Sequence, residues 1–355
     1  QTRHPVVIYP ASGTGAWEAA LVNVMSPGDA VLMYETGHFA TLWNRMALRL
    51  ALKPEFLALP GSDETGLPRS WRHGVQAELV EQRLRNDPQH RIKAVCVVHN
   101  ETSTGVTSDI AAVRRAIDAT GHPALLMVDT ISGLASADFR HDEWGVDVTV
   151  SGSQKGLMLP PGISFNALSP RAIAASKTAT LPKAFWAWDE IVEMNQGGYW
   201  PYTPNTNLLY GLSEALDMLL EQGLPVVFAR HRRWGEGVRA AVRAWGLPIQ
   251  CADERVHSPV LTGVITPVGV DADALRKLIH TRFDLSLGTG LGKLKGRMFR
   301  MGHLGDSNDL TLVAMVAGVE MGLKLAGVKL AGSGVQAAMN HYASHAAPSA
   351  LRVAA

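Results

Sequence analysis

The chain has 355 residues, of which 46% are hydrophobic, and its mean hydropathy of +0.04 is consistent with a sizeable core in one large domain or two. Lysine and arginine (33) nearly balance aspartate and glutamate (32), and there is no basic tract or basic stripe with aromatics, which argues against a nucleic-acid partner. No apolar stretch reaches the roughly 20 residues that span a bilayer, no signal pattern opens the sequence, and Cys96 and Cys251 lack partners at metal-ligand spacing, so we expect a cytoplasmic, non-membrane protein with buried thiols and no metal.

Short apolar, β-branched runs alternate with longer helical patterns through the first two-thirds of the chain. This alternation is typical of βαβ units and a mostly parallel sheet. Strands are expected at residues 5–9, 30–34, 53–59, 94–99, 124–128, 147–151 and 164–168. Helices are expected near residues 16–24, 39–49, 74–86 and 108–119. The pattern predicts an α/β fold with a wide central sheet between helices.

A long amphipathic helix is predicted over residues 207–221, and Gly223 and Pro225 follow it as a helix stop. We therefore place a boundary there, with a large domain over residues 1–222 and a smaller α+β domain over residues 223–355.

The smaller domain is predicted to open with an Arg- and Ala-rich helix. Strand-like runs at residues 259–266 and 297–302 and a helix from residue 271 complete its regular elements. The tail after residue 331 is rich in Gly, Ala and Ser, so we expect it to pack loosely.

A small, Gly-rich turn follows the first strand and opens a helix, with the sequence Ala-Ser-Gly-Thr-Gly-Ala over residues 11–16. Backbone N–H groups and the positive end of the helix dipole suit a phosphate at such a turn. The turn lacks a Walker lysine, which disfavours a nucleoside triphosphate. A plain strand-to-helix turn is the alternative interpretation.

Two residues at the ends of neighbouring predicted strands carry the strongest chemical signal. Asp129 ends the apolar run Pro-Ala-Leu-Leu-Met-Val-Asp, and Lys155 lies in Ser-Gly-Ser-Gln-Lys-Gly after Val-Asp-Val-Thr-Val. Pyridoxal phosphate needs an anion at its ring nitrogen and an amine at its aldehyde, and this pair supplies both. Taken singly, Asp129 is also compatible with a helix-capping role and Lys155 with a solvated loop.

Five segments together resemble the class V (fold type I) pyridoxal-phosphate aminotransferases, especially those that act on glyoxylate with serine, alanine or aspartate. The likeness extends from about residue 5 to residue 340. The segments are Ser-Gly-Thr-Gly-Ala-Trp-Glu-Ala-Ala-Leu, His-Asn-Glu-Thr-Ser-Thr-Gly-Val, Val-Asp-Thr-Ile-Ser-Gly, Gly-Ser-Gln-Lys-Gly-Leu-Met-Leu-Pro-Pro-Gly and Pro-Tyr-Thr-Pro.

The resemblance implies a complete cofactor site. Lys155 is then the catalytic lysine that binds the cofactor's aldehyde, and Asp129 is the partner of the pyridinium nitrogen. The residues implied to hold the phosphate are Ser12, Gly13, Thr14 and Gln154.

Further roles follow from the same likeness. Phe39 is implied to stack on the cofactor ring, with a core phenylalanine as the alternative, and the Thr102 hydroxyl is implied to lie near the phenolic oxygen. Tyr202 and Thr203 match a segment that reaches the phosphate of the neighbouring subunit, which would make the active site a product of a homodimer. The alternative is that this aromatic loop packs on its own subunit.

Arg300 is implied to bind the substrate carboxylate, a task for which a planar guanidinium is suited. Arg297 is the rival three residues earlier. The glycines of residues 288–292 resemble a dinucleotide loop, but they follow no first strand of a βαβ unit, so we expect a flexible active-site loop.

The resemblance implies transamination of glyoxylate to glycine, with L-serine as the donor that gives hydroxypyruvate, or alternatively alanine or aspartate. A pyridoxal lyase or decarboxylase would use the same lysine and aspartate. From another class, a nicotinamide-dependent Rossmann oxidoreductase would explain the alternating pattern but not Lys155. The family's N-terminal segment, with its Pro-Gly-Pro loop, is missing, and we expect the sequence to be a truncated piece rather than one with different substrate contacts.

Overall fold

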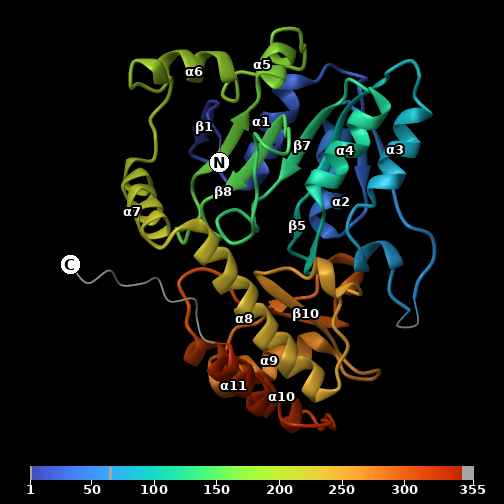
Figure 1. Ribbon diagram of the computed structural model, residues 1–355, viewed down its shortest axis with the longest axis vertical. Helices are drawn as coiled ribbons and strands as arrows, with labels where there is room; N and C mark the ends of the chain where they lie inside the picture. Colours follow the sequence, from blue (N-terminus) through green and yellow to red (C-terminus); the bar gives the residue numbers. More distant parts are fainter. Residues whose placement is uncertain (1, 64–65, 346–355) are drawn as a thin grey trace.

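A seven-stranded sheet forms the centre of the larger part of the molecule in the computed structural model, which describes residues 2–63 and 66–345 (Figure 1). Its strands are β1 (Val6–Tyr9), β2 (Ala30–Tyr34), β3 (Lys53–Leu57), β4 (Ile92–Val98), β7 (Leu125–Asp129), β8 (Val148–Gly152) and β9 (Ser164–Leu168). They lie in the order β1-β9-β8-β7-β4-β2-β3, and only β9 runs antiparallel to its neighbours. The predicted mostly parallel sheet is confirmed, with all seven strands within two residues of their expected bounds.

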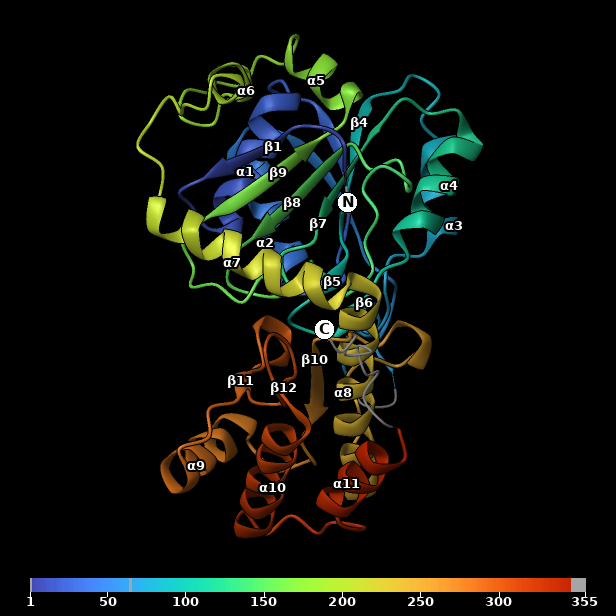
Figure 2. The ribbon, with the colours of Figure 1, turned by 60° about the vertical axis from the view of Figure 1, so that its left-hand side comes forward.

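Helices cover both faces of this sheet (Figure 2). One face packs against α1 (Gly13–Val24), α2 (His38–Arg49) and α5 (Pro170–Ser176), and the other against α3 (Ala77–Arg85) and α4 (Ile110–Thr120). In β4, Cys96 faces the first group of helices and Val95 and Val97 face the second, which explains the unbroken apolar run over residues 94–98. The predicted arrangement of a sheet between helices is therefore confirmed.

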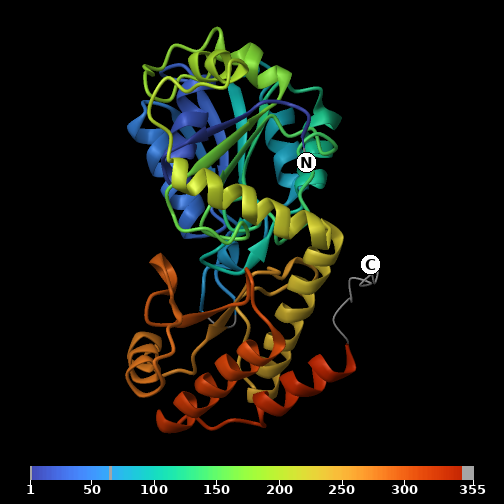
Figure 3. The same ribbon diagram turned by 90° about the vertical axis from the view of Figure 1, so that its left-hand side faces the viewer.

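The smaller part of the molecule has its own apolar core and a three-stranded antiparallel sheet in the order β10-β12-β11. The long helix α8 descends from the larger part along this core (Figure 3). The elements from residue 188 onward are α6 (Trp188–Gln196), α7 (Thr206–Gln222), α8 (Leu224–Trp245), β10 (Leu261–Ile265), α9 (Ala272–Phe283), β11 (Gly288–Thr289), β12 (Met298–Gly302), α10 (Asp309–Leu325) and α11 (Gly334–Ser344). The boundary proposed between residues 222 and 223 falls between α7 and α8, and the division into two domains remains a prediction.

The expectation that the chain packs loosely after residue 331 is wrong as far as residue 345. Helix α11 packs against α8, where the Tyr342 hydroxyl donates a hydrogen bond to the Trp234 carbonyl (2.9 Å). The Glu320 carboxylate accepts hydrogen bonds from the Val335 N–H (3.1 Å) and the Trp245 indole (3.0 Å). A Cβ atom on Gly334 would lie 2.3 Å from Trp245 Nε1, so this small residue allows α11 to approach α8 closely. Residues 346–355 lie outside the described part of the chain.

Within residues 2–63 and 66–345, every helix is too short or too polar to cross a membrane. The same ranges contain no group of three or more His, Cys, Asp or Glu side chains that could hold a metal ion. Cys96 and Cys251 are free and buried, as expected, and burial raises the pKa of both thiols.

Candidate active site

Asp129 is the last residue of β7 and is only 4% exposed. Its Oδ2 atom accepts a hydrogen bond from the Trp17 indole (3.0 Å), and its Oδ1 atom accepts one from the Ile131 N–H (2.7 Å). Burial raises the pKa of this carboxyl to about 7, and the nearby Glu101 carboxylate also raises it. No cationic side chain in the described ranges pairs with Asp129, so the site contains a buried acid suited to a cationic ligand.

Lys155 follows β8, the parallel neighbour of β7, so both residues lie at the same edge of the sheet. The Ser153 hydroxyl donates a hydrogen bond to the Pro160 carbonyl (2.8 Å) and closes the loop that carries the lysine. Burial lowers the pKa of Lys155, and the positive charge of Arg300 lowers it further. A lowered pKa increases the fraction of neutral, nucleophilic amine.

The Gly-rich turn lies directly beside Asp129. A Cβ atom on Gly13 would lie 2.2 Å from Ile131 Cδ1, so a larger residue at this position would require the Ile131 side chain to move. Ser12 is the N-cap residue of α1 but makes no side-chain cap, and the first turn contains no acidic residue. The N–H groups of Gly13 and Thr14 have no acceptor among the described residues, which leaves them available to an anion.

Gln154 lies next to the same turn. Its Oε1 atom is buried without a hydrogen-bond partner in the described part of the chain. A Cβ atom placed on Gly152 would lie 3.0 Å from this Oε1 atom and 3.5 Å from the Gly13 nitrogen, so Gln154 and Gly13 both lie close to Gly152. The structure therefore brings together the four residues expected to hold a phosphate: Ser12, Gly13, Thr14 and Gln154.

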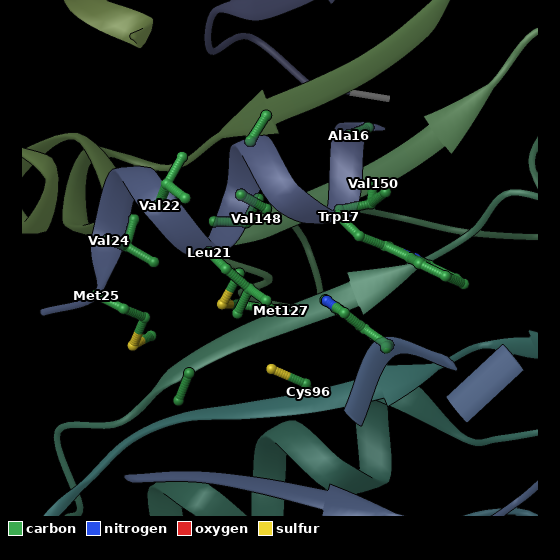
Figure 4. Packing of buried hydrophobic residues seen from close by; sticks show 14 of the residues in the cluster. Ala16, Trp17, Leu21, Val22, Val24, Met25, Cys96, Met127, Val148 and Val150 are labelled. Atoms are coloured by element: carbon green, nitrogen blue, oxygen red, sulfur yellow. The ribbon is translucent and has the colours of Figure 1, made fainter. Parts of the chain in front are cut away.

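Phe39 is the second residue of α2 and is half-buried. Its ring centre lies 6.5 Å from that of Trp17 in an edge-on contact at 60°. Trp17 itself stacks on Trp43 at 5.8 Å, and with Leu21 it packs α1 onto the strands (Figure 4). Phe39 therefore contacts the same indole that donates to Asp129.

Arg300 lies on β12 and reaches from the smaller sheet toward the larger one. Its Nε atom donates a hydrogen bond to the Thr289 carbonyl (2.9 Å), and its Nη1 atom donates one to the Thr102 carbonyl (2.8 Å). Burial lowers the pKa of this guanidinium. Its rival Arg297 is exposed and donates to the Gly66 carbonyl (3.3 Å), so Arg300 is the arginine that lies beside Lys155.

The loop of residues 288–292 includes regular structure. It contains β11 and the start of a 3-10 helix (Gly292–Leu294) whose Leu294 is fully buried. Leu294 belongs to a small apolar cluster with Trp71 and Met298, and the flexibility expected of residues 288–292 remains a prediction.

Tyr202 contacts its own chain through its hydroxyl and its ring, and its approach to a neighbouring subunit remains a prediction. Its hydroxyl donates a hydrogen bond to the Ile8 carbonyl (3.2 Å), and its ring stacks on Phe185 at 4.5 Å. Burial raises the pKa of Tyr202 to about 12. Thr203 is exposed, and the Thr102 hydroxyl makes no hydrogen bond within the described ranges.

Sequence reasoning missed three residues of this site. Trp17 was part of a helix pattern, and Glu101 and Ser103 were part of a polar run after a strand. Glu101 is 1% exposed, and Ser103 donates to it through both its N–H (3.0 Å) and its hydroxyl (2.6 Å). The signal available in the sequence was a carboxyl residue placed just beyond a buried strand, at the edge where ligands of parallel sheets bind.

The sheet topology excludes the nicotinamide oxidoreductase that the sequence left open. The dinucleotide-binding fold has a parallel sheet of order 3-2-1-4-5-6, whereas this sheet has the order β1-β9-β8-β7-β4-β2-β3 with an antiparallel β9. With its reactive groups after β7 and β8 and its smaller C-terminal part, the architecture is that of the fold type I pyridoxal-phosphate enzymes.

Comparison with known proteins agrees with this class. The sequence profile "Aminotransferase class-V" matches residues 2–246. Serine–glyoxylate aminotransferase of Methylorubrum extorquens is 45% identical over 96% of this chain and 84% of its own length. L-aspartate–glyoxylate aminotransferase of Paracoccus denitrificans is 44% identical over the same shares. The crystal structure of pyridoxamine-pyruvate aminotransferase from Mesorhizobium loti superposes with a TM-score of 0.85 at 28% identity, over 96% of this chain and 85% of that one.

The chain therefore belongs to the class V aminotransferases. It is an aminotransferase, and its family and structural neighbours imply pyridoxal phosphate as the cofactor.

Proposed function

We propose that this chain transfers the amino group of L-serine to glyoxylate, which yields hydroxypyruvate and glycine. Relatives named for this reaction are 44–45% identical to the chain over at least 95% of its length. Alanine and aspartate are the alternative donors, and a relative named for aspartate is equally similar at 44%. A cytoplasmic location remains a prediction.

The observation that carries this proposal is the buried Asp129 carboxylate, which lacks a cationic partner among the described residues and lies at the same sheet edge as Lys155. Pyridoxal phosphate supplies an electron sink for the carbanion left when the α-proton of the amino donor is removed. A protonated pyridine nitrogen would give Asp129 the charge partner that its burial requires. The residues present therefore fit this cofactor.

The other residues would bind and orient the ligands. Lys155, with its lowered pKa, is the amine for the cofactor's aldehyde and the group that carries the α-proton. Phe39 would stack on the ring, the Thr102 hydroxyl would donate to the phenolic oxygen, and Arg300 would bind the substrate carboxylate through its free Nη2 edge. The phosphate would be held by Ser12, Gly13, Thr14 and Gln154.

A homodimer in which Tyr202 and Thr203 approach the partner's phosphate site is part of the proposal. Exposed apolar side chains on the adjacent helix α7 support an interface, since Tyr210 is 80% and Leu220 is 65% exposed. Sedimentation of the purified protein at micromolar concentration tests this point, and a monomer that retains full activity would contradict it.

The first experiment is Lys155→Ala, which should abolish both the visible absorbance of the covalently bound cofactor and transamination. Lys177→Ala is the matched control, because Lys177 is exposed after α5 and should leave both unchanged. Full activity in the Lys155→Ala protein would refute the assignment.

A panel of L-serine, L-alanine and L-aspartate with glyoxylate then identifies the donor from the loss of cofactor absorbance in single half-reactions. Product formation without any oxoacid would instead indicate a lyase or decarboxylase.

A further inference from the structure

The first turn of α2 is capped from outside the helix. The N-cap residue Gly37 has no side chain to cap with, and the first turn contains no acidic residue. Instead the Phe39 N–H donates to Glu101 Oε1 (3.3 Å) and the Ala40 N–H donates to Glu101 Oε2 (3.1 Å). The His38 N–H donates to the Ser103 hydroxyl (2.8 Å). The N–H groups that a helix start leaves unpaired are thus satisfied by one segment of chain some 60 residues away.

Glu101 belongs to a short hairpin of β5 (Asn100–Glu101) and β6 (Val106–Thr107). The hairpin is fixed to the segment after Asp129, because the Asn100 amide donates to the Ser132 hydroxyl (2.7 Å). The contact with α2 is also tight: a Cβ atom on Gly37 would lie 2.4 Å from Glu101 Cγ. The position of this carboxylate is therefore set from three sides.

Two site residues depend on this carboxylate through short paths. Phe39 donates its N–H to Glu101 and presents its ring to Trp17, the partner of Asp129. The next residue in the chain, Thr102, accepts the Arg300 hydrogen bond through its carbonyl. Glu101 thus connects the aromatic ring of the larger sheet with the guanidinium of the smaller one.

A plain helix cap would need only one oxygen and no connection to the ligands. Glu101 uses both oxygens on α2, is 1% exposed, and has no ion-pair partner in the described part of the chain. Its negative charge also acts on the site, since it raises the pKa values of Asp129 and Arg300. These contacts exceed what the stability of α2 alone requires.

We propose that Glu101 is a positioning residue that sets the place of Phe39 against the cofactor ring and, through Thr102, the orientation of Arg300 toward the substrate carboxylate. This inference rests on the proposed function. Glu101 itself touches neither ligand, so its effect passes through the two neighbours.

The test compares Glu101→Gln with wild type as holoenzymes. An amide nitrogen cannot accept a hydrogen bond, so one α2 N–H loses its acceptor and Phe39 shifts. We expect a smaller visible circular-dichroism band from the bound pyridoxal phosphate, faster cofactor loss on dilution, and kcat/KM for glyoxylate reduced by up to about 100-fold, as an ångström-scale misplacement produces. Part of the loss should appear in KM, because Arg300 is also displaced.

Asp109→Asn is the matched control for a purely structural cap. Asp109 caps α4 by accepting the Ala112 N–H (2.8 Å), and it is exposed and makes no hydrogen bond to a site residue within the described ranges. Asparagine keeps the cap acceptor but removes the negative charge from the N-terminus of α4, so the variant should lower the melting temperature slightly while leaving the dichroic band and KM unchanged. The same pattern in Glu101→Gln would overturn the positioning role and leave Glu101 as a helix cap.

A second variant keeps the proposal testable if Glu101→Gln does not fold. Gly37→Ala retains the charge but forces the carboxylate away from α2, and it should reproduce the changes in the dichroic band and KM. Glu101→Asp, which restores a charged acceptor on a shorter arm, should recover part of both. The positioning role is refuted if wild type shows a pyridoxal band and transamination and the Gly37→Ala protein has the same band and the same KM. If wild type shows neither the band nor transamination, it is the proposed function that fails.

Discussion

Replacing Asp129 by Asn should affect the stability of the cofactor-free protein and the binding of the cofactor in opposite directions. The pKa of Asp129 rises from an ordinary value of 3.8 to about 7 on burial. The stability that the neutral carboxyl contributes is fully present below pH 3.8, the pKa of this group in the unfolded chain. It is lost as the pH rises from there through the folded pKa of about 7. Because one pKa unit corresponds to about 1.4 kcal/mol, ionised Asp129 should destabilise the fold by about 4 kcal/mol at pH 8.

Asparagine removes this charge but has a single acceptor for the two donors, the Trp17 indole and the Ile131 N–H. One unsatisfied buried donor costs about 1–3 kcal/mol, so the net gain at pH 8 should be about 1–3 kcal/mol. At pH 5 most folded molecules already carry neutral Asp129, and the advantage over wild type should shrink by about 2–3 kcal/mol.

Urea unfolding of the cofactor-free Asp129→Asn and wild-type proteins at pH 5 and pH 8 measures this difference. Affinity for pyridoxal phosphate, followed by quenching of tryptophan fluorescence, should fall in the same variant, because the pyridinium loses its anion. A stability change of the same sign and size at both pH values would refute the reasoning that the carboxylate is buried without a charge partner.

Two further substitutions probe the substrate arginine and the packing of the last helix. In Arg300→Lys the ammonium cannot keep both carbonyl contacts and also present two donors to a carboxylate. The KM for glyoxylate should therefore rise about 10- to 100-fold, which corresponds to the loss of one charged hydrogen bond. The control Arg297→Lys, at an exposed position, should leave KM unchanged. Glu320→Gln should lower the stability at pH 7 by about 1–3 kcal/mol. Burial alone would raise the pKa of Glu320. Hydrogen bonds from Lys324, the Trp245 indole and the Val335 N–H instead lower this pKa to about 2. This stabilisation is fully present above pH 4.5, the pKa of the group in the unfolded chain, and is lost as the pH falls toward 2. If thermal melts show the same difference in stability between wild type and Glu320→Gln at pH 7 and at pH 2, the assignment is contradicted.

The elements that the sequence predicted well are those whose signal is local. The central strands β2, β4 and β7 are mostly apolar runs, because helices bury them on both faces. Asp129 and Lys155 were recognisable for the same reason: each follows such a run, and parallel strands place their carboxyl ends at one edge.

What the sequence did not predict depends on contacts between distant segments. Helix α11 includes small residues such as Gly334, Ala337 and Ala338, which resemble a loose tail until α8 is placed beside them. Glu101 meets the Phe39 N–H from 62 positions away, and Arg300 meets the Thr102 carbonyl from 198 positions away. No periodicity within either segment encodes these pairings, since they arise only when the folded sheet brings its loops together.

Burial explains the two opposite pKa shifts at the centre of the site with one cause. It disfavours the charged form of each group, so the pKa of Asp129 rises to about 7 while that of Lys155 falls. The fall makes Lys155 a better nucleophile before any ligand binds, whereas the rise leaves Asp129 only partly ionised near neutral pH. A pyridinium at Asp129 would offset the rise in the pKa of Asp129. It would not reverse the fall in the pKa of Lys155, because Arg300 continues to hold the lysine pKa down. A buried sheet edge thus favours a cationic ring at Asp129 and a reactive amine at Lys155 together, and substitutions that open it to water should weaken both.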